Sequence, residues 1–128
     1  MTILGIGVDI VEISRLNAAI QRQGQPFLER CFCAAEQAYC QSHREPARFY
    51  AARFAAKEAV AKALGTGIGA QLTWRDIEVL RAEEGAPSIQ LHGTGAETAK
   101  RLGVQSVLIS ISHSEHYAVA NAVAVGQA

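Results

Sequence analysis

The stretch from Phe54 to Gly67, which reads FAAKEAVAKALGTG, constrains the fold more than any other part of the chain. Alanine is the strongest helix former and glycine the commonest helix stop. The pattern therefore predicts a helix that ends in a flexible turn at Gly65, Thr66 and Gly67. Pro46 suits the first turn of a helix and places its start nearby. The small alanine side chains allow another backbone or a ligand to come close.

Three charged residues, Lys57, Glu58 and Lys62, interrupt this apolar helix. Glu58 and Lys62 are one helical turn apart and project together, whereas Lys57 falls within the apolar stripe. Charges beside a packed stripe cost stability unless they are paired or bind something. Two interpretations follow: a core helix with a surface Glu58–Lys62 pair, or a helix that carries a functional site.

Length and composition exclude several classes of protein. A chain of 128 residues that is 49% apolar is expected to form one globular domain, here residues 1–128. Its formal net charge of zero argues against a general nucleic-acid binder. No apolar run approaches the about 20 residues of a membrane span. The three cysteines match no zinc or redox spacing, and without a secretory signal they predict reduced thiols in a cytoplasmic protein.

The basic residues are unevenly spread along this neutral chain. Five of them fall in one segment that only Glu45 and Glu58 oppose: Arg44, Arg48, Arg53, Lys57 and Lys62. Most of the basic residues of the chain are arginine, whose fork suits phosphate and carboxylate. The segment therefore predicts a local anion site.

The N-terminal segment Ile3–Val11 alternates like a strand and carries an aspartate near its end. Asp9 shares one face with Gly5 and Gly7, which we expect to leave open space beside the carboxylate. The segment lacks the full dinucleotide fingerprint, so a Rossmann fold is rejected. Asp9 either caps the following helix or binds a hard metal such as Mg²⁺.

The remaining segments predict short helices and antiparallel strands. A helix over Glu12–Gln23 places Arg15 and Arg22 on one face, where they are either solvated or meet an acidic partner. Residues 25–43 are expected to pack against the core and to contain a helix at Ala34–Cys40. A hairpin of two strands is expected within 72–84 and 88–91. A helix is expected over Thr94–Leu102, with a capping box of Thr94 and Glu97, followed by strands over 104–112 and 117–125.

Ser112 and His113 lie where the two C-terminal strands connect. A histidine at such a turn is more often solvated than a ligand, and a strand-end serine often has no role. Both side chains can nevertheless offer hydrogen bonds to a phosphate. The fold class that follows is α+β, with an antiparallel β-sheet packed against the long helix.

Taken together and in this order, the motifs resemble the holo-acyl-carrier-protein synthases, the small single-domain branch of the phosphopantetheinyl transferases. The resemblance covers nearly the whole chain, to about Val125. It rests on the segments Gly5–Ile10 with Arg15, Arg53–Ala59, Lys62–Gly67, and Ser110–His113 with Tyr117 and Ala118.

The resemblance implies an activity and a set of roles. Members of the family move 4′-phosphopantetheine from coenzyme A to a serine of apo acyl carrier protein, need Mg²⁺, and work as homotrimers with sites at the subunit interfaces. Asp9 and Glu58 match metal-binding positions, and Lys62 a lysine near the pyrophosphate. Arg53 and His113 match positions around the coenzyme A phosphates, the Gly65–Gly67 loop approaches the nucleotide, and Arg15 matches a carrier-protein contact.

These roles agree with the chemistry of phosphoryl transfer, which depends on positioning and charge neutralisation. A metal held by Asp9 and Glu58 would neutralise the pyrophosphate. Glu58, directly or through a bound water, is the expected base for the serine hydroxyl, and Lys62 is expected to stabilise the leaving phosphate.

One position departs from the family pattern. Cys33 stands where the family usually has threonine before a helix, with Glu36 three residues on. Cysteine is a poor cap, at a cost of about 1 kcal/mol, so local stability rather than chemistry is affected.

Two other functions stay open from the sequence. A sensor that binds coenzyme A or carrier protein without catalysis would not need both carboxylates. A Mg²⁺-dependent phosphoester hydrolase would cleave coenzyme A in the absence of carrier protein.

Overall fold

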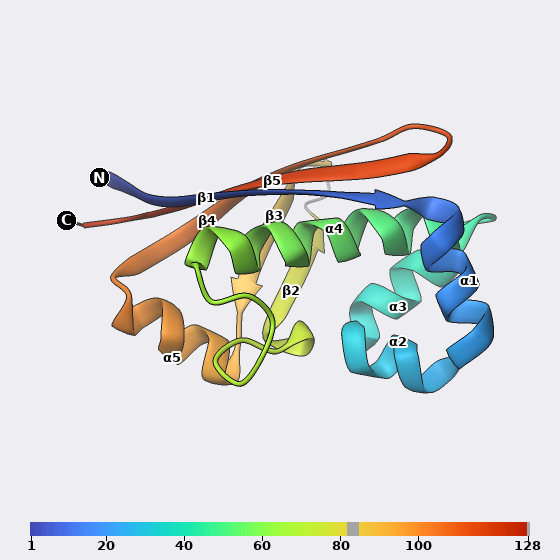
Figure 1. The fold of residues 1–128 in the computed structure, drawn as a ribbon, viewed down its shortest axis with the longest axis horizontal. Helices are drawn as coiled ribbons and strands as arrows, with labels where there is room; N and C mark the ends of the chain where they lie inside the picture. Colours follow the sequence, from blue (N-terminus) through green and yellow to red (C-terminus); the bar gives the residue numbers. More distant parts are fainter. Residues whose placement is uncertain (82–84, 128) are drawn as a thin grey trace.

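A three-stranded antiparallel sheet and one long helix form the centre of the molecule (Figure 1). The computed structural model describes residues 1–81 and 85–127. The strands are β1 (Thr2–Glu12), β4 (Val104–His113) and β5 (Tyr117–Gly126), in the order β1-β5-β4. The helix α4 (Pro46–Leu64) runs along one face of this sheet (Figure 1). The predicted α+β class is confirmed. The helix α4 begins at the proline, and Gly65 is its C-cap, as the sequence predicts.

Smaller elements gather at the two ends of α4 (Figure 1). At one end lie α1 (Ile13–Gln23), α2 (Gln25–Cys31) and α3 (Ala34–Gln41). Toward the other end lie the 3₁₀ turn η1 (Trp74–Asp76) and α5 (Gly93–Arg101). The strands β2 (Ile77–Arg81) and β3 (Pro87–Leu91) pair only with each other, so the predicted hairpin forms a separate two-stranded sheet.

The structure refines the predicted elements in three places. Residues 25–31, expected only as packing, form the short helix α2 with a proline in its first turn. The strand expected within 72–84 is β2, and η1 precedes it. The connection between the two hairpin strands starts outside the described residues, and Pro87 is already paired with Arg81 as the first residue of β3.

The predicted capping box of α5 is wrong. The helix begins at Gly93 with His92 as its N-cap, so Thr94 lies inside the first turn. The cap comes from another element: Asp76 accepts a hydrogen bond of 3.2 Å from the N–H of Gly95. A Cβ on Gly95 would lie 2.8 Å from the Cβ of Asp76, so glycine is needed for this approach. A tertiary contact has replaced the local one.

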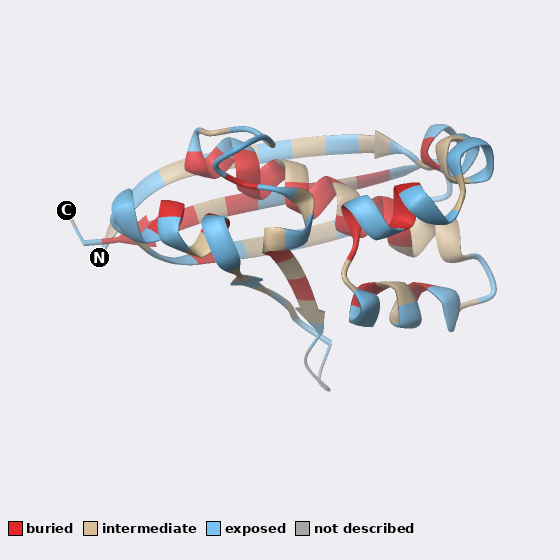
Figure 2. Cartoon of the chain, turned by 90° about the horizontal axis from the view of Figure 1, so that it is seen from below, coloured by how far each residue is buried: buried red, intermediate tan, exposed pale blue. Residues whose placement is uncertain are grey.

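The core is built on α4, whose residues supply much of the buried surface (Figure 2). One face of the helix packs on the sheet through alanines of both elements, among them Ala55, Ala59, Ala120 and Ala122. The other end packs against α1, α2 and α3 through larger side chains, including Leu16, Phe27, Phe32 and Tyr50. Small residues on the sheet side allow the helix and the strands to lie close together.

A buried ion pair ties α4 to its neighbours. Lys57 is fully buried, and its Nζ donates to Glu36 Oε1 at 2.7 Å and to the carbonyls of Cys31 and Trp74. Glu36 also accepts the backbone N–H groups of Cys33 and Val79, each at 2.8 Å. Glu36 therefore accepts the hydrogen bond from the N-cap residue Cys33, as expected. Lys57 is paired with Glu36 and is not free to bind a ligand.

The other face of the three-stranded sheet is apolar and exposed. In β1 the exposed side chains include Ile6 at 72%, Ile10 at 64% and Val8 at 53%, and Leu108 of β4 is exposed by 59%. The alternation predicted for β1 is present, and its glycine-bearing face is the one that packs on α4. Within the described ranges, no helix is both long and apolar enough to cross a membrane.

Candidate active site

The contact between β1 and α4 places the first candidate carboxylate. A Cβ on Gly5 would lie 1.9 Å from the Ala63 carbonyl oxygen, and one on Gly7 would lie 2.1 Å from that of Ala59. The two glycines therefore leave no open space, contrary to the expectation, because the backbone of α4 fills it. Two strand residues span about 6.7 Å and one helical turn about 5.4 Å, so Asp9 reaches the next turn of α4 toward its N-terminus.

Asp9 meets α4 through Lys62. The Lys62 Nζ lies 3.1 Å from Asp9 Oδ1 and 2.9 Å from the Val8 carbonyl oxygen. The Lys62 side chain is 51% exposed, and that of Asp9 is 19% exposed. The capping alternative for Asp9 is not what the structure contains, since Glu12 is the N-cap of α1. The sequence suggested a surface pair between Glu58 and Lys62, whereas in the structure Lys62 forms its salt bridge with Asp9.

Glu58 is the second carboxylate at this position. Its burial raises the pKa above the ordinary value, the negative charge of Asp9 raises it further, and Lys62 partly opposes both. Glu58 therefore lies close enough to Asp9 to feel its charge. No group of three or more histidine, cysteine, aspartate or glutamate side chains that could hold a metal occurs among residues 1–81 and 85–127.

The chemistry of this donor set fits Mg²⁺. That ion binds through one or two protein carboxylates and takes its other ligands from water and substrate phosphates. Asp9 and Glu58 supply two carboxylates whose mutual repulsion a divalent cation would relieve.

The turn after α4 is open on its outer side, although the N–H groups of Gly65 and Gly67 donate to the carbonyls of Lys62 and Ala61. Gly65 has φ 79° and Gly67 φ 65°, so both adopt the left-handed conformation that glycine tolerates. No heavy atom of the described structure lies within 4 Å of a Cβ built on either glycine. Thr66 donates its hydroxyl to the Gly67 carbonyl at 2.9 Å. A phosphate can approach this turn without a side chain in the way.

A second group of candidate residues lies on the opposite side of α4. Arg53 is five residues before Glu58 and nine before Lys62, so it projects about 140–180° away from them. It lines a pocket of about 160 Å³ with His113, Tyr39, Phe49 and Arg81, among others. Arg53 is only 7% exposed, and its Nε has no hydrogen-bond partner in the described structure. A buried guanidinium with spare donors favours an anionic ligand.

The structure separates Ser112 from His113. Successive residues of a strand point to opposite faces. His113 lines the Arg53 pocket together with Ile111, two residues away in β4, whereas Ser112 is opposite Val119 in β5 and belongs to the outer sheet face. Within a single chain the two side chains therefore project to opposite faces of the sheet.

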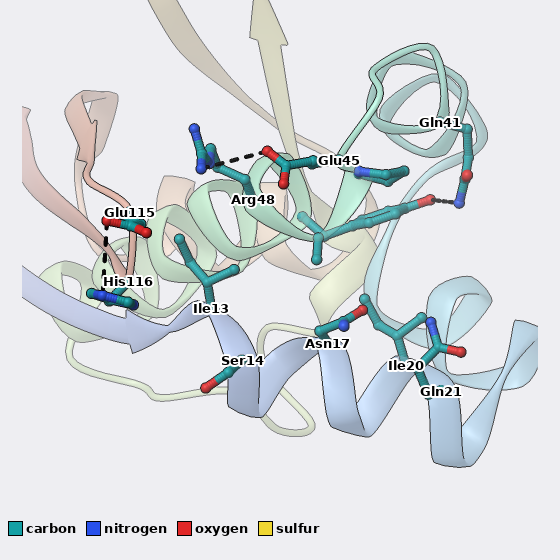
Figure 3. A pocket seen from close by; sticks show the side chains of 13 residues that line it. Ile13, Ser14, Asn17, Ile20, Gln21, Gln41, Glu45, Arg48, Glu115 and His116 are labelled. Carbon is teal, nitrogen blue, oxygen red and sulfur yellow. Dashed lines mark hydrogen bonds and ion pairs between the residues drawn. The ribbon is translucent and has the colours of Figure 1, made fainter.

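Arg15 and Arg22 share one face of α1, as predicted. They line a shallow hollow whose floor includes Phe27 and Phe54. This hollow combines two cations with the edges of two largely buried aromatic side chains. A different hollow, of about 450 Å³, lies on the other side of α1 and is lined by Asn17, Arg48 and His116, among others (Figure 3). None of the predicted site residues lines it.

The basic segment of the sequence is dispersed in space. Arg48 pairs with Glu45 at 3.6 Å, Lys57 with Glu36, and Lys62 with Asp9. A single anion site made from the whole segment is therefore not formed. Tyr39 and Arg81, which adjoin Arg53, were missed because they come from α3 and β2 and follow no common spacing with it.

Comparison with known proteins places this geometry in a family. A model of the 4′-phosphopantetheinyl transferase superfamily matches residues 5–122. The chain belongs to this superfamily. The holo-[acyl-carrier-protein] synthase of Koribacter versatilis is 48% identical over 121 residues, which cover 94% of this chain and 97% of that protein. The enzyme of the same description from Chlamydia caviae is 51% identical over 118 residues, covering 92% and 93%.

Solved transferase structures of the superfamily share the fold. The crystal structure of the holo-[acyl-carrier-protein] synthase from Neisseria meningitidis superposes with a TM-score of 0.91 at 33% identity, covering 97% of this chain and 99% of that one. The Helicobacter pylori enzyme, solved in complex with coenzyme A, gives 0.84 at 36% identity, covering 94% and 99%.

Proposed function

We propose that Asp9, Glu58 and Lys62 form the centre at which this enzyme transfers 4′-phosphopantetheine from coenzyme A to a serine of apo acyl carrier protein. The activity is that of a holo-[acyl-carrier-protein] synthase, releases adenosine 3′,5′-bisphosphate and serves fatty acid biosynthesis. The observation that carries the site assignment is the packing of β1 on α4, which brings two acids and a lysine together.

Asp9 and Glu58 would hold Mg²⁺. When bound, the ion supplies charge neutralisation for the pyrophosphate of coenzyme A. Glu58 takes the proton of the attacking serine hydroxyl. A carboxylate within reach of the hydroxyl, directly or through a bound water, suits this role.

Lys62 stabilises the leaving phosphate. Its side chain is half exposed, so its ammonium can leave Asp9 and contact a substrate oxygen. The open turn of Gly65, Thr66 and Gly67 follows α4 directly and accepts the nucleotide side of the substrate.

Arg53 and His113 hold the other phosphate of coenzyme A. The pyrophosphate is assigned to the Asp9 side of α4, and the Arg53 pocket lies across the helix, so the anion there is the separate 3′-phosphate. One coenzyme A molecule cannot reach both sides of α4 in a single chain without passing around it. We therefore assign the two halves of each site to two neighbouring copies of the chain.

The apolar outer face of the sheet provides the contact between copies. Ile6, Val8 and Ile10 expose more than half of their surface, on a face that also carries Ser112. Exposed apolar surface of this extent marks an association site. We assign it to a homotrimer, a state that also brings Ser112 toward a subunit interface.

Arg15 and Arg22 receive the carrier protein. They flank aromatic surface beside β1, which leads to Asp9. The enzyme is expected in the cytoplasm, which its three free thiols support.

The deciding experiment follows the mass of the carrier protein after incubation with coenzyme A, Mg²⁺ and enzyme. The wild type converts apo carrier to the heavier holo form, and chelation of Mg²⁺ stops it. Glu58→Gln abolishes transfer, and Lys62→Ala lowers turnover far more than it weakens coenzyme A binding. Near-normal transfer by Glu58→Gln, or equal losses for Lys62→Ala, would refute the assigned roles.

The metal assignment has its own measurement. Mg²⁺ at 100 times its dissociation constant stabilises a protein that binds it by about 2.7 kcal/mol. Wild-type enzyme should show this thermal shift, whereas Asp9→Asn and Glu58→Gln should not. Cleavage of coenzyme A without carrier protein would instead indicate a hydrolase.

A further inference from the structure

The guanidinium of Arg53 rests on an aromatic ring. Its Cζ lies 4.2 Å from the centroid of the Tyr39 ring, which comes from α3. A cation over an aromatic face is attracted by the ring quadrupole, most strongly where water is excluded. Arg53 is 7% exposed, and no carboxylate of residues 1–81 or 85–127 forms a salt bridge with it. Among the described residues, the ring is therefore the main protein group that stabilises this charge.

Tyr39 is itself held in place from several sides. Arg81 of β2 donates from Nη1 to the Tyr39 hydroxyl, and its Cζ lies 5.4 Å from the ring centroid. His43 and Phe49 pack edge-on against the same ring, with centroids 4.7 and 5.9 Å away. Phe49 in turn contacts the His113 ring at 5.9 Å. A fixed ring limits the positions that the Arg53 guanidinium can take.

Within residues 1–81 and 85–127, this arrangement leaves the anion-binding capacity of Arg53 unused. A carboxylate partner would neutralise the arginine and compete with a substrate phosphate, whereas a ring holds it without occupying its hydrogen-bond donors. The Nε donor is unpartnered in the described part of the chain. Arg81 and His113, both exposed, stand at the same pocket and add polar groups that face the ligand.

We propose that Tyr39 is the positioning residue for Arg53, and that Arg81 is a second cation of the same site, so that together they select a nucleotide carrying a 3′-phosphate. This inference rests on the proposed function, which gives Arg53 to that phosphate. Tyr39 does not touch the substrate. It acts by holding the guanidinium in the orientation that the phosphate requires, which lowers the ordering cost of binding.

The test compares coenzyme A with 3′-dephospho-coenzyme A, which lacks only the phosphate in question. Tyr39→Leu should raise the KM for coenzyme A about tenfold, since a desolvated cation–π contact is worth about that factor. The kcat should stay within about twofold, and the KM for the dephospho substrate should be unchanged. Tyr39→Phe keeps the ring, so its KM for coenzyme A should lie much closer to the wild-type value than that of Tyr39→Leu. The small increase that remains should be similar to the increase caused by Arg81→Gln.

The outcomes separate this inference from the function on which it rests. If Arg53→Gln raises the KM of both substrates equally, the assignment of Arg53 to the 3′-phosphate is wrong. If Arg53→Gln affects only coenzyme A but Tyr39→Leu affects both substrates equally, Tyr39 has a structural role only and the inference is overturned. If Tyr39→Leu does not fold, Arg81→Gln is the deciding variant, because the Arg81 side chain is exposed. Equal increases in the KM of the two substrates would then refute the proposed site.

Discussion

Glu58 illustrates how a residue suited to catalysis weakens the fold that holds it. Burial and the neighbouring Asp9 raise its pKa, which means that the charged form is disfavoured in the folded protein. The folded chain therefore retains the Glu58 proton to higher pH than the unfolded chain does. Stability is lost as the pH rises from the usual glutamate pKa through the raised value, and the loss persists above it.

The substitution Glu58→Gln should remove this pH-dependent loss. The melting temperature of the variant should match that of the wild type near pH 4 and exceed it increasingly toward pH 7, in metal-free buffer. Thermal unfolding at a series of pH values measures the difference. A difference that is independent of pH would show that the raised pKa of Glu58 has no part in stability.

Lys57 shows the opposite case, a charge that is entirely structural. The substitution Lys57→Met leaves the Glu36 carboxylate buried without its cation, which is expected to cost about 3–5 kcal/mol. The double variant Lys57→Met/Glu36→Gln removes the stranded charge and should be at least about 1 kcal/mol more stable than the single one. Urea unfolding of both variants gives the comparison, and losses that simply add would contradict the coupling.

The sequence indicated the important charges but not their partners. Lys57, Glu58 and Lys62 stand out because charges are rare on an alanine helix, and Asp9 because it follows two glycines. Their pairing with Glu36 and Asp9 depends on which elements pack together, which no local spacing reveals. Tyr39 beside Arg53 is a contact of the same kind, between two helices, so it too was missed.

At the scale of elements, the register of β1 on α4 determines the site. Gly7→Ala should separate the two elements, because its Cβ would lie 2.1 Å from the backbone oxygen of Ala59. The expected loss is about 1–3 kcal/mol, with a fall in turnover as Asp9 moves. Gly69→Ala is the matched control, since nothing lies within 4 Å of its Cβ. Chemical denaturation and transfer assays should leave the control unchanged; similar losses in both variants would contradict the register argument.

The helix α1 presents two faces that provide a test of carrier binding. Arg15→Glu should raise the KM for carrier protein about tenfold or more and leave the KM for coenzyme A unchanged, because like charges repel the acidic partner. Asn17→Glu adds a charge on the other face of α1, in the hollow of Figure 3, and should have little effect. Equal effects of the two substitutions would exclude the Arg15 face as the docking surface.

Elements were predictable where a local rule decided them. Pro46 and Gly65 mark the ends of α4, and alternation marks β1, β4 and β5. The start of α5 was not predictable, because Asp76 of another element caps it and the capping signal at Thr94 is unused. The helix α2 lacks the length for a clear apolar period, so its sequence looked like irregular packing.

The whole molecule presents an apolar sheet face whose partner the sequence does not reveal. Alternation in β1 shows that one face is apolar and the other carries glycines and Asp9. It does not show that the glycine face is the buried one, which depends on the close approach of α4. The apolar face is therefore exposed, and we propose that neighbouring copies of the chain cover it.

If each site combines Asp9 and Glu58 of one copy with Arg53 and His113 of the next, two defective variants should complement each other. Glu58→Gln and Arg53→Glu are each expected to be nearly inactive with coenzyme A. After dissociation and reassembly of an equal mixture, about a quarter of the interfaces should pair an intact acid centre with an intact arginine, and about a quarter of wild-type activity should return.

Ile6→Lys, placed in both variants, removes the apolar contact and should abolish the recovery, while Leu102→Lys, an exposed leucine off the sheet, should not. Light scattering should report smaller particles only for the Ile6 variant. A mixture that stays inactive while the assembly is intact would mean that each chain builds its site alone.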